Sequence, residues 1–78
     1  MSRAMGYGEA LDLALQGSKA QRSGWNGKGM HVELAAGAVL PDGRQIEPFL
    51  MLRTADGKWV PWTVSQTDCT AFDWQILE

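Results

Sequence analysis

The apolar residues near the start of the chain recur with the spacing of an amphipathic helix. Positions i, i+3, i+4, i+7 and i+8 share one helix face, and here they hold Tyr7, Ala10, Leu11, Ala14 and Leu15. Gly17 follows this stripe, where glycine commonly ends a helix. We therefore predict a helix over residues 7–16, preceded by frayed residues 1–6. Leu13 lies off the stripe, either as a singly exposed leucine or as part of a subunit contact.

From residue 19 onward the apolar pattern changes to the two-residue period of β-strands. Lys19–Arg22 is interpreted as a short strand that enters a glycine-rich loop. Met30, Val32 and Leu34 then alternate with two polar residues, which predicts a half-buried strand. This alternation places His31 on the polar, solvated face of the sheet.

Two Asp-Gly pairs lie between apolar segments and predict β-hairpins at Asp42-Gly43 and Asp56-Gly57. The expected turns need φ > 0 at both central residues. Phe49–Leu52 is continuously apolar, as in a strand covered on both faces, one by the helix and the other by a partner subunit. Pro61 cannot donate to a ladder, so the strand after the second hairpin should end there or lie at an edge.

A second helical element and a last strand are predicted near the end of the chain. Ser65-Gln66-Thr67-Asp68 has the spacing of a capping box, which predicts a helical turn from about Gln66 to Ala71. Asp73–Leu77 is interpreted as the final strand. The expected fold is α+β, with one N-terminal helix packed on a small antiparallel meander sheet, in a single domain of residues 1–78.

Length and composition indicate a chain that needs additional support. A chain of 78 residues buries only about 60–65% of the surface that its unfolded form exposes. Below about 80 residues, stability usually comes from disulfides, a metal or oligomerisation as well. Cys69 is the only cysteine and His31 the only histidine, so neither a disulfide nor a metal-ligand cluster is available. We therefore expect no cofactor and no metal, and a homo-oligomer.

Charge and hydropathy narrow the class of partner. The net charge is −2 and the seven basic residues are scattered, which argues against nucleic acid but allows a small anion held by a few of them. No apolar run approaches the roughly 18 residues of a membrane span, so no membrane partner is expected. The chain is expected to be soluble and cytosolic.

The strongest candidate for a binding site is the loop Arg22-Ser23-Gly24-Trp25-Asn26-Gly27-Lys28-Gly29-Met30. Glycines let another group approach the backbone closely, and a tryptophan beside cations can serve a charged aromatic ligand. The alternative is a hairpin loop whose Trp25 folds back onto the core. Trp62 also lies at a strand end, where binding groups are usually carried, whereas Trp59 and Trp74 lie within strands and are interpreted as core.

Catalysis receives little support from the sequence. Cys69 has no nearby histidine, and the serines lie in no nucleophile elbow. Asp68 and Asp73 are better interpreted as a helix cap and a turn residue than as an acid–base pair, and there is no P-loop or zinc spacing. We predict that the protein is not an enzyme.

Several segments together resemble the Thoeris anti-defence two-like family of small phage and prophage proteins. The resemblance spans residues 7–76 and rests on segments that occur in the family's order: Gly8-Glu9-Ala10-Leu11, the glycine loop Arg22–Met30, Thr54-Ala55-Asp56-Gly57, Val60-Pro61-Trp62, Ser65-Gln66-Thr67-Asp68 and Asp73-Trp74. The segment from Met30 to Pro48 is short and lacks the long insertion that many relatives carry.

This resemblance implies a non-enzymatic sponge that acts in the cytoplasm of the infected or lysogenic bacterial host. Such a protein, tetrameric in characterised relatives, sequesters a cyclic ADP-ribose-type immune signal, and some relatives also hold cyclic dinucleotides. A tryptophan would stack on the purine, the glycine loop with Lys28 or Arg22 would meet the pyrophosphate, and polar groups would bond the hydroxyls. The ligand-binding residues expected on this basis are Arg22, Trp25, Asn26, Gly27, Lys28, Gly29, Trp62, Thr67 and Asp68.

Two other classes of function stay open on the sequence. One is a phage structural or protein-interaction module whose tryptophans anchor a protein interface. The other is a small hydrolase of nucleotide signals that uses Asp68 or His31.

Overall fold

Helix α1 spans Tyr7–Leu15 in the computed structural model, which describes residues 4–77. It ends in a Schellman motif, in which the Ser18 N–H donates to the Leu13 carbonyl and the Gly17 N–H to the Ala14 carbonyl, both at 3.0 Å. Gly17 has a φ of 106°, as a glycine after a helix end commonly does. The helix and its stop signal were therefore predicted correctly.

The buried stripe of α1 is narrower than the spacing predicts. Ala10 and Ala14 are buried, whereas Leu15 is 51% exposed. The two small alanines let the helix lie close to the sheet, and Leu15, at the last turn, extends past the covered region. Leu13, which lies off the predicted stripe, is half-buried.

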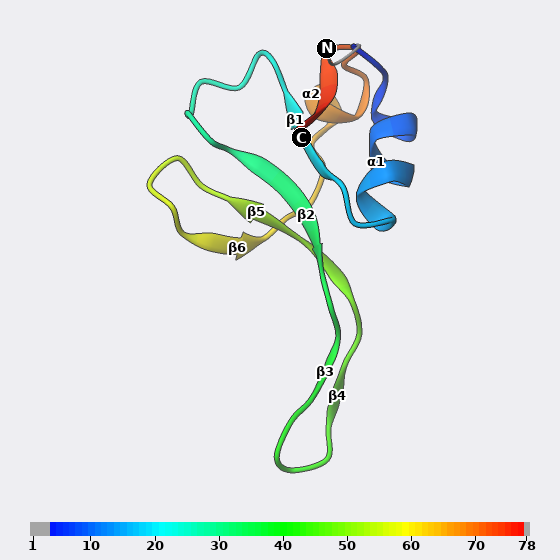
Figure 1. The fold of residues 1–78 in the computed structure, drawn as a ribbon, viewed down its shortest axis with the longest axis vertical. Helices are drawn as coiled ribbons and strands as arrows, with labels where there is room; N and C mark the ends of the chain where they lie inside the picture. The colour runs from blue at the N-terminus through cyan, green and yellow to red at the C-terminus, as the bar shows by residue number, and fades with distance from the viewer. Residues whose placement is uncertain (1–3, 78) are drawn as a thin grey trace.

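Five antiparallel strands form the main sheet, in the order β6-β5-β2-β1-β7 (Figure 1). Their bounds are Lys19–Arg22 for β1, His31–Ala35 for β2, Phe49–Arg53 for β5, Trp59–Pro61 for β6 and Trp74–Leu77 for β7. Strand β6 lies at one edge, as its proline suggested. The final strand does not extend the meander but crosses to the other edge and pairs with β1, for example Lys19 with Leu77.

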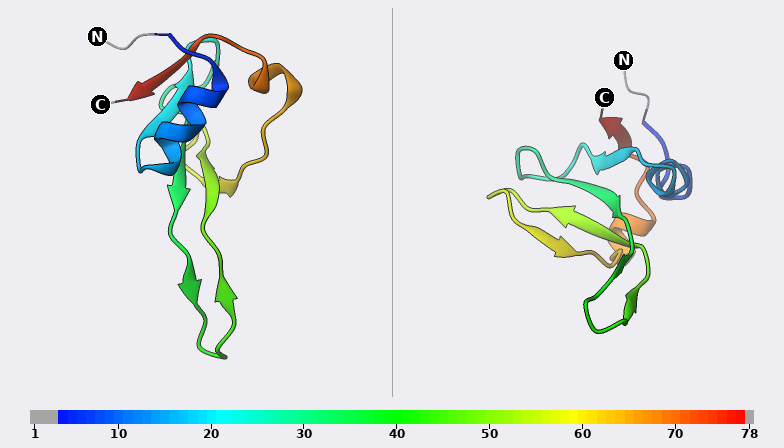
Figure 2. Two further views of the ribbon diagram at one scale, coloured as in Figure 1. Left: turned by 90° about the vertical axis from the view of Figure 1, so that its right-hand side faces the viewer. Right: turned by 60° about the horizontal axis from the view of Figure 1, so that its bottom comes forward.

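The other two strands form an arm that projects from the body. Strands β3 (Ala38–Val39) and β4 (Gln45–Ile46) make a separate two-stranded sheet, which extends away from both helices (Figure 2). The molecule is consequently 43 Å long but only 26 and 25 Å across. Residues 41–49 are all exposed, so the arm packs on nothing else in the described chain.

The turns at the two Asp-Gly pairs differ from the expected form. Gly43 and Gly57 have φ values of 91° and 85°, but no non-glycine residue in the described chain has a positive φ. The Gly43 N–H donates to the Leu40 carbonyl at 2.9 Å, as in a type I turn followed by a left-handed glycine. Pro41 explains this in the arm, because its ring fixes a negative φ at the first central position.

Both helices lie on one face of the main sheet. Helix α1 packs mainly on β1, β2 and β7 and also contacts α2 (Gln66–Cys69). The buried apolar core consists of Ala10, Ala14, Ala20, Val32 and Trp74. Strand β5 is farther from the helix than predicted and is only half-buried, with Phe49 39% exposed. The reason is the sheet order, which places β5 next to the edge strand.

The predicted fraying of the N-terminal residues is wrong for Met5. Its N–H and carbonyl form hydrogen bonds of 2.9 and 3.0 Å with the backbone of Trp74, so this residue bridges to β7. Residues 1–3 lie outside the described part of the chain. No helix within residues 4–77 has the length and apolar character needed to cross a membrane.

Candidate functional site

The glycine loop between β1 and β2 makes close contacts that only glycine permits. A Cβ atom on Gly27 would lie 2.2 Å from the sulfur of Met30 and 2.7 Å from the Cβ of Ala55. Gly29 has a φ of 80°, and a Cβ there would lie 2.6 Å from a guanidinium nitrogen of Arg53. The loop therefore packs directly against the β5–β6 turn, and it holds Arg53 beside its backbone.

Arg22 anchors the start of this loop through two carboxylates. Its Nη1 lies 2.8 Å from Asp68 Oδ1 and its Nε lies 2.7 Å from Asp73 Oδ1, and only 18% of the Arg22 side chain is exposed. Asp68 also accepts a hydrogen bond from the indole of Trp25 at 3.1 Å, and Asp73 accepts one from the Gly24 N–H at 2.9 Å. We call these groups the arginine cluster: Arg22, Gly24, Trp25, Asp68 and Asp73.

Charge pairing perturbs the acid–base behaviour of the arginine cluster. Burial would raise the pKa of Asp68, but the hydrogen bonds from Arg22 and Trp25 outweigh it and hold that pKa below its ordinary value. Arg22, opposed by desolvation, also lowers the pKa of Asp73. Asp73 and Asp68 in turn raise the pKa of Arg22, so all three groups are charged at neutral pH.

Trp25 folds back onto the core, as in the alternative interpretation of the loop. Its ring lies 5.3 Å from that of Trp74 and 6.4 Å from that of Trp62, edge-on in both cases. Trp62 also contacts Tyr7 and Trp74. Trp25 and Trp62 are both half-buried, so each packs within an aromatic cluster while part of its surface reaches solvent.

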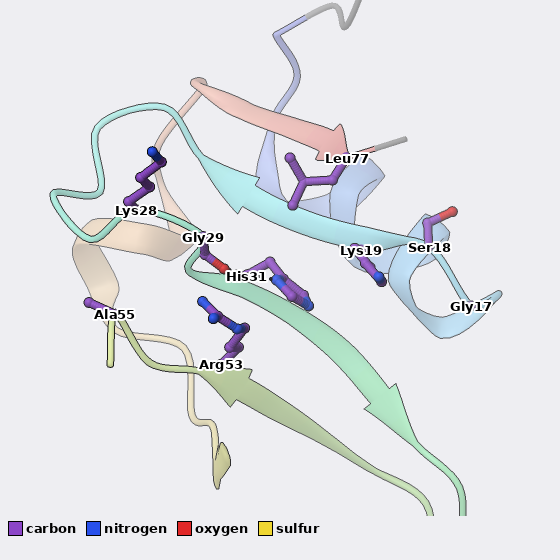
Figure 3. Close-up of a pocket in the computed structure, with 9 residues that line it drawn as sticks. All are labelled: Gly17, Ser18, Lys19, Lys28, Gly29, His31, Arg53, Ala55 and Leu77. Atoms are coloured by element: carbon purple, nitrogen blue, oxygen red, sulfur yellow. Dashed lines mark hydrogen bonds between the residues drawn. The ribbon is translucent and has the colours of Figure 1, made fainter. Parts of the chain in front are cut away.

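A basic pocket lies on the other side of the loop (Figure 3). It is open, has a volume of about 810 Å³, and includes Lys28 and Gly29 from the glycine loop. Lys19, Lys28 and Arg53 bring positive charge to it, and within residues 4–77 none of these three side chains forms an ion pair. The remaining lining residues are Gly17, Ser18, His31, Ala55 and Leu77.

His31 lies in this pocket and is buried, which corrects its predicted placement on a solvated face. It is only 7% exposed, and its Nδ1 lies 3.0 Å from the Gly29 carbonyl, so this nitrogen carries the proton. Its Nε2 is buried without a hydrogen-bond partner in the described chain, with Glu33 Oε1 at 3.9 Å. The face was predicted correctly, but the glycine loop and the Trp59 ring cover it.

Trp59 was interpreted as a core residue, and that prediction is wrong. Its side chain is 45% exposed on the edge strand β6. It pairs across the strands with Arg53, which in turn pairs with His31 on β2. Residues paired across antiparallel strands point to the same face, so Trp59 shares the face of the basic pocket.

The predicted ligand-binding residues thus divide between the two sides of the loop. Lys28 and Gly29 line the basic pocket, and Gly27 holds the loop against the β5–β6 turn. Asn26 and Thr67 are exposed. Arg22, Trp25, Trp62 and Asp68 lie on the helix side, in the arginine and aromatic clusters.

The sequence interpretation missed four residues of the pocket face: Lys19, His31, Arg53 and Trp59. The predicted turn would not have placed them, because a two-residue Asp56-Gly57 loop pairs Arg53 with Val60, whereas the observed register pairs Arg53 with Trp59. No group of three or more His, Cys, Asp or Glu side chains suited to a metal ion occurs within residues 4–77.

Comparison with known proteins places the chain in a class. The profile of the Thoeris anti-defense 2-like domain matches residues 5–77, so the chain belongs to this family. It is 40% identical over 88 aligned positions to Thoeris anti-defense 2 of Bacillus phage SP01, and this alignment covers 99% of each protein. The alignment is longer than this chain, so the relative has residues at positions where this chain has none.

Proposed function

We propose that the protein counteracts Thoeris defence by sequestering a small anionic signal of the cyclic ADP-ribose type, without chemical conversion. Membership of the Thoeris anti-defense 2-like family supports the anti-defence role. The observation that carries the sequestration is the basic pocket, where three cationic side chains without ion-pair partners in the described chain surround an open cavity.

The charge of this pocket fits a pyrophosphate. The chain has a net charge of −2, yet several of its carboxylates are already engaged elsewhere, as in the pairs of Asp68 and Asp73 with Arg22. Lys28 and Arg53 are left to attract an anion. A guanidinium offers two parallel donors to phosphate oxygens and an ammonium adds a point charge. The pocket volume of about 810 Å³ lies in the range of small-molecule sites.

The other predicted contacts belong to the same proposal. Asn26, within the glycine loop, is exposed and would bond ligand hydroxyls. Thr67 is also exposed, but it lies on α2, on the helix side of the loop. Arg22 and Asp68 bond each other and hold the loop, so their role in binding would be positional. Trp25 and Trp62 would offer the ligand only the part of each ring that the aromatic cluster leaves open.

A protein-interaction module is the second candidate, and the exposed arm favours it. Val39 and Ile46 on the arm are 71% and 41% exposed, and Phe49 at its base is 39% exposed. In the proposed sponge these residues would instead contact other copies of the chain, in a tetramer as the family resemblance implies.

One uptake experiment separates the candidates. The purified protein is mixed with a cyclic ADP-ribose isomer, desalted and heat-denatured, and the released nucleotide is analysed by chromatography. A sponge releases the intact isomer in stoichiometric amount, and an enzyme releases a converted product. If no tested isomer and no cyclic dinucleotide is retained, sequestration is refuted and the interaction module is favoured.

A further inference from the structure

The exposed aromatic surface of the pocket face has no assigned role in the fold. Trp59 is 45% exposed on an edge strand, and its only aromatic neighbour in the described chain is His31, at 5.4 Å between ring centroids and an interplanar angle of 80°. That contact is edge to face. It fixes the position of the indole but leaves much of its surface open to solvent.

The other three tryptophans are less available. Trp74 is 1% exposed. Trp25 and Trp62 each contact at least two other aromatic rings, and the indole N–H of Trp25 is bonded to Asp68. Stacking a base on either of them would have to compete with core packing, whereas stacking on Trp59 would displace only solvent.

The position of Trp59 relative to the cations is set by strand register. Arg53 pairs directly with Trp59 on one side and with His31 on the other. The guanidinium of Arg53 lies near the two glycine turns, since a Cβ on Gly29 or Gly57 would lie 2.6 or 3.5 Å from its nitrogens. An anion bound by Arg53 would therefore lie close to Trp59, which pairs with Arg53 on the neighbouring strand.

We infer that Trp59 is the aromatic residue that stacks on the base of a nucleotide whose phosphates lie between Arg53 and Lys28. This inference rests on the proposed function, and it names the ligand class for that site as a nucleotide that carries both a base and a pyrophosphate. Base–aromatic stacking does not depend on which base is present, and it contributes enough binding free energy to raise the affinity of a sponge about fivefold or more. The ring of His31 contacts the indole from the neighbouring part of the same face.

Two probes separate the base from the phosphates. Cyclic ADP-ribose carries both groups, and inorganic pyrophosphate carries only the anion. Trp59→Ala should weaken binding of cyclic ADP-ribose roughly fivefold to 150-fold and leave pyrophosphate affinity within about twofold of wild type. Trp59→Phe should retain most of the affinity, because the smaller ring still stacks. Isothermal titration calorimetry on the full chain measures the affinity of wild type and of each variant for each probe.

Phe72→Ala is the matched control, because Phe72 is 81% exposed but lies beside Gly6 at the start of α1, away from Arg53 and Lys28. It should bind both probes as wild type does. Thermal unfolding should show that Trp59→Ala stays folded, and light scattering should show an unchanged mass.

Each other outcome has a definite meaning. If wild type binds cyclic ADP-ribose and Trp59→Ala binds it equally well, the inference is wrong while the proposed function stands. Equal losses for both probes would mean that Trp59 shapes the pocket rather than stacks, and a change in mass would make it a subunit contact, so either result overturns the inference. If wild type binds no nucleotide tested in the uptake experiment, the proposed function fails as well.

Discussion

Asp68 links several parts of the molecule through different atoms. Its N–H donates to the Ser65 hydroxyl at 3.1 Å, which caps α2. Its carboxylate accepts hydrogen bonds from Arg22 and Trp25, and its carbonyl accepts the indole N–H of Trp74 at 2.8 Å. The capping box therefore has two roles. It caps the start of α2, and it positions the Asp68 carboxylate, which holds the glycine loop. A ligand that contacts this loop would therefore meet a backbone that Asp68 already holds in place through Arg22 and Trp25.

We predict that acid destabilises the fold through the arginine cluster. Asp68 and Asp73 have a lower pKa folded than unfolded. Such groups stabilise the fold fully above the unfolded value of about 3.9, and this contribution is lost as the pH falls through the lowered folded value. The melting temperature should therefore fall steeply below about pH 4, which circular dichroism between pH 2 and 7 can measure.

Substitutions in the arginine cluster test where the acid sensitivity arises. Asp68→Asn should lower the melting temperature at pH 7 and flatten its dependence on acid. Asp42→Asn is the matched control, because the Asp42–Arg44 pair lies on the exposed arm and exposed pairs contribute little. Acid sensitivity of Asp68→Asn equal to that of wild type would place the responsible groups elsewhere.

The cations of the pocket give a second prediction at this scale. Lys28→Ala or Arg53→Ala should weaken pyrophosphate binding roughly tenfold to 100-fold, since hydrogen bonds to charged groups contribute about 1.5–3 kcal/mol. The melting temperature should change little, because neither side chain forms an ion pair within the described chain. Lys58→Ala removes an exposed lysine outside the pocket lining as a control. Unchanged pyrophosphate binding by both pocket variants would contradict the site.

At the scale of elements, two glycines with similar backbone geometry have different consequences. Gly17 ends α1 with a φ of 106°, and Gly43 closes the arm with a φ of 91°. An alanine at a positive φ costs about 1–2 kcal/mol. Helix α1 packs on the core, whereas the arm packs on nothing else in the described chain, and a lone two-stranded hairpin is marginally stable in water.

We therefore predict unequal effects of the same substitution. Gly17→Ala should lower the melting temperature by about 4–8 °C per kcal/mol lost, as is typical of domains of this size. In dissociated chains, such as those that carry Val39→Asp and Ile46→Asp, Gly43→Ala should leave the main transition unchanged, because there it disturbs the arm alone. Differential scanning calorimetry on both variants is the measurement. Equal losses would show that the arm unfolds together with the body.

The elements with local signals could be predicted from the sequence. The apolar stripe and Gly17 define α1, and the capping box defines α2. The pairing of β7 with β1 has no local signal, since it depends on where the chain goes after α2. In the candidate site, too, some residues have a local signal and others depend on the path of the chain. Lys28 lies in a recognisable loop, whereas Arg53 reaches the pocket only through the sheet order and register.

At the scale of the whole molecule, the chain exposes more surface than a compact monomer of its mass. Its accessible surface is 5316 Å² for a mass of 8.6 kDa, whereas a compact monomer of that mass exposes about 4,700 Å². The projecting arm accounts for such an excess. Seven large hydrophobic residues of the described chain are exposed, against five hydrophobic residues that are buried. A core of this size gives little stability by itself.

We predict that the protein is a homo-oligomer, a tetramer by its family resemblance, and that the arm forms part of the contact. Val39→Asp combined with Ile46→Asp should reduce the mass measured by light scattering at micromolar concentration, because burying unpaired charges in an interface is costly. In a monomer these exposed positions would tolerate aspartate. Phe72→Asp, also on an exposed residue but away from the arm, tests whether any added charge has this effect. A monomeric mass for wild type would refute the assembly, and dissociation by Phe72→Asp alone would move the contact from the arm to the region after α2.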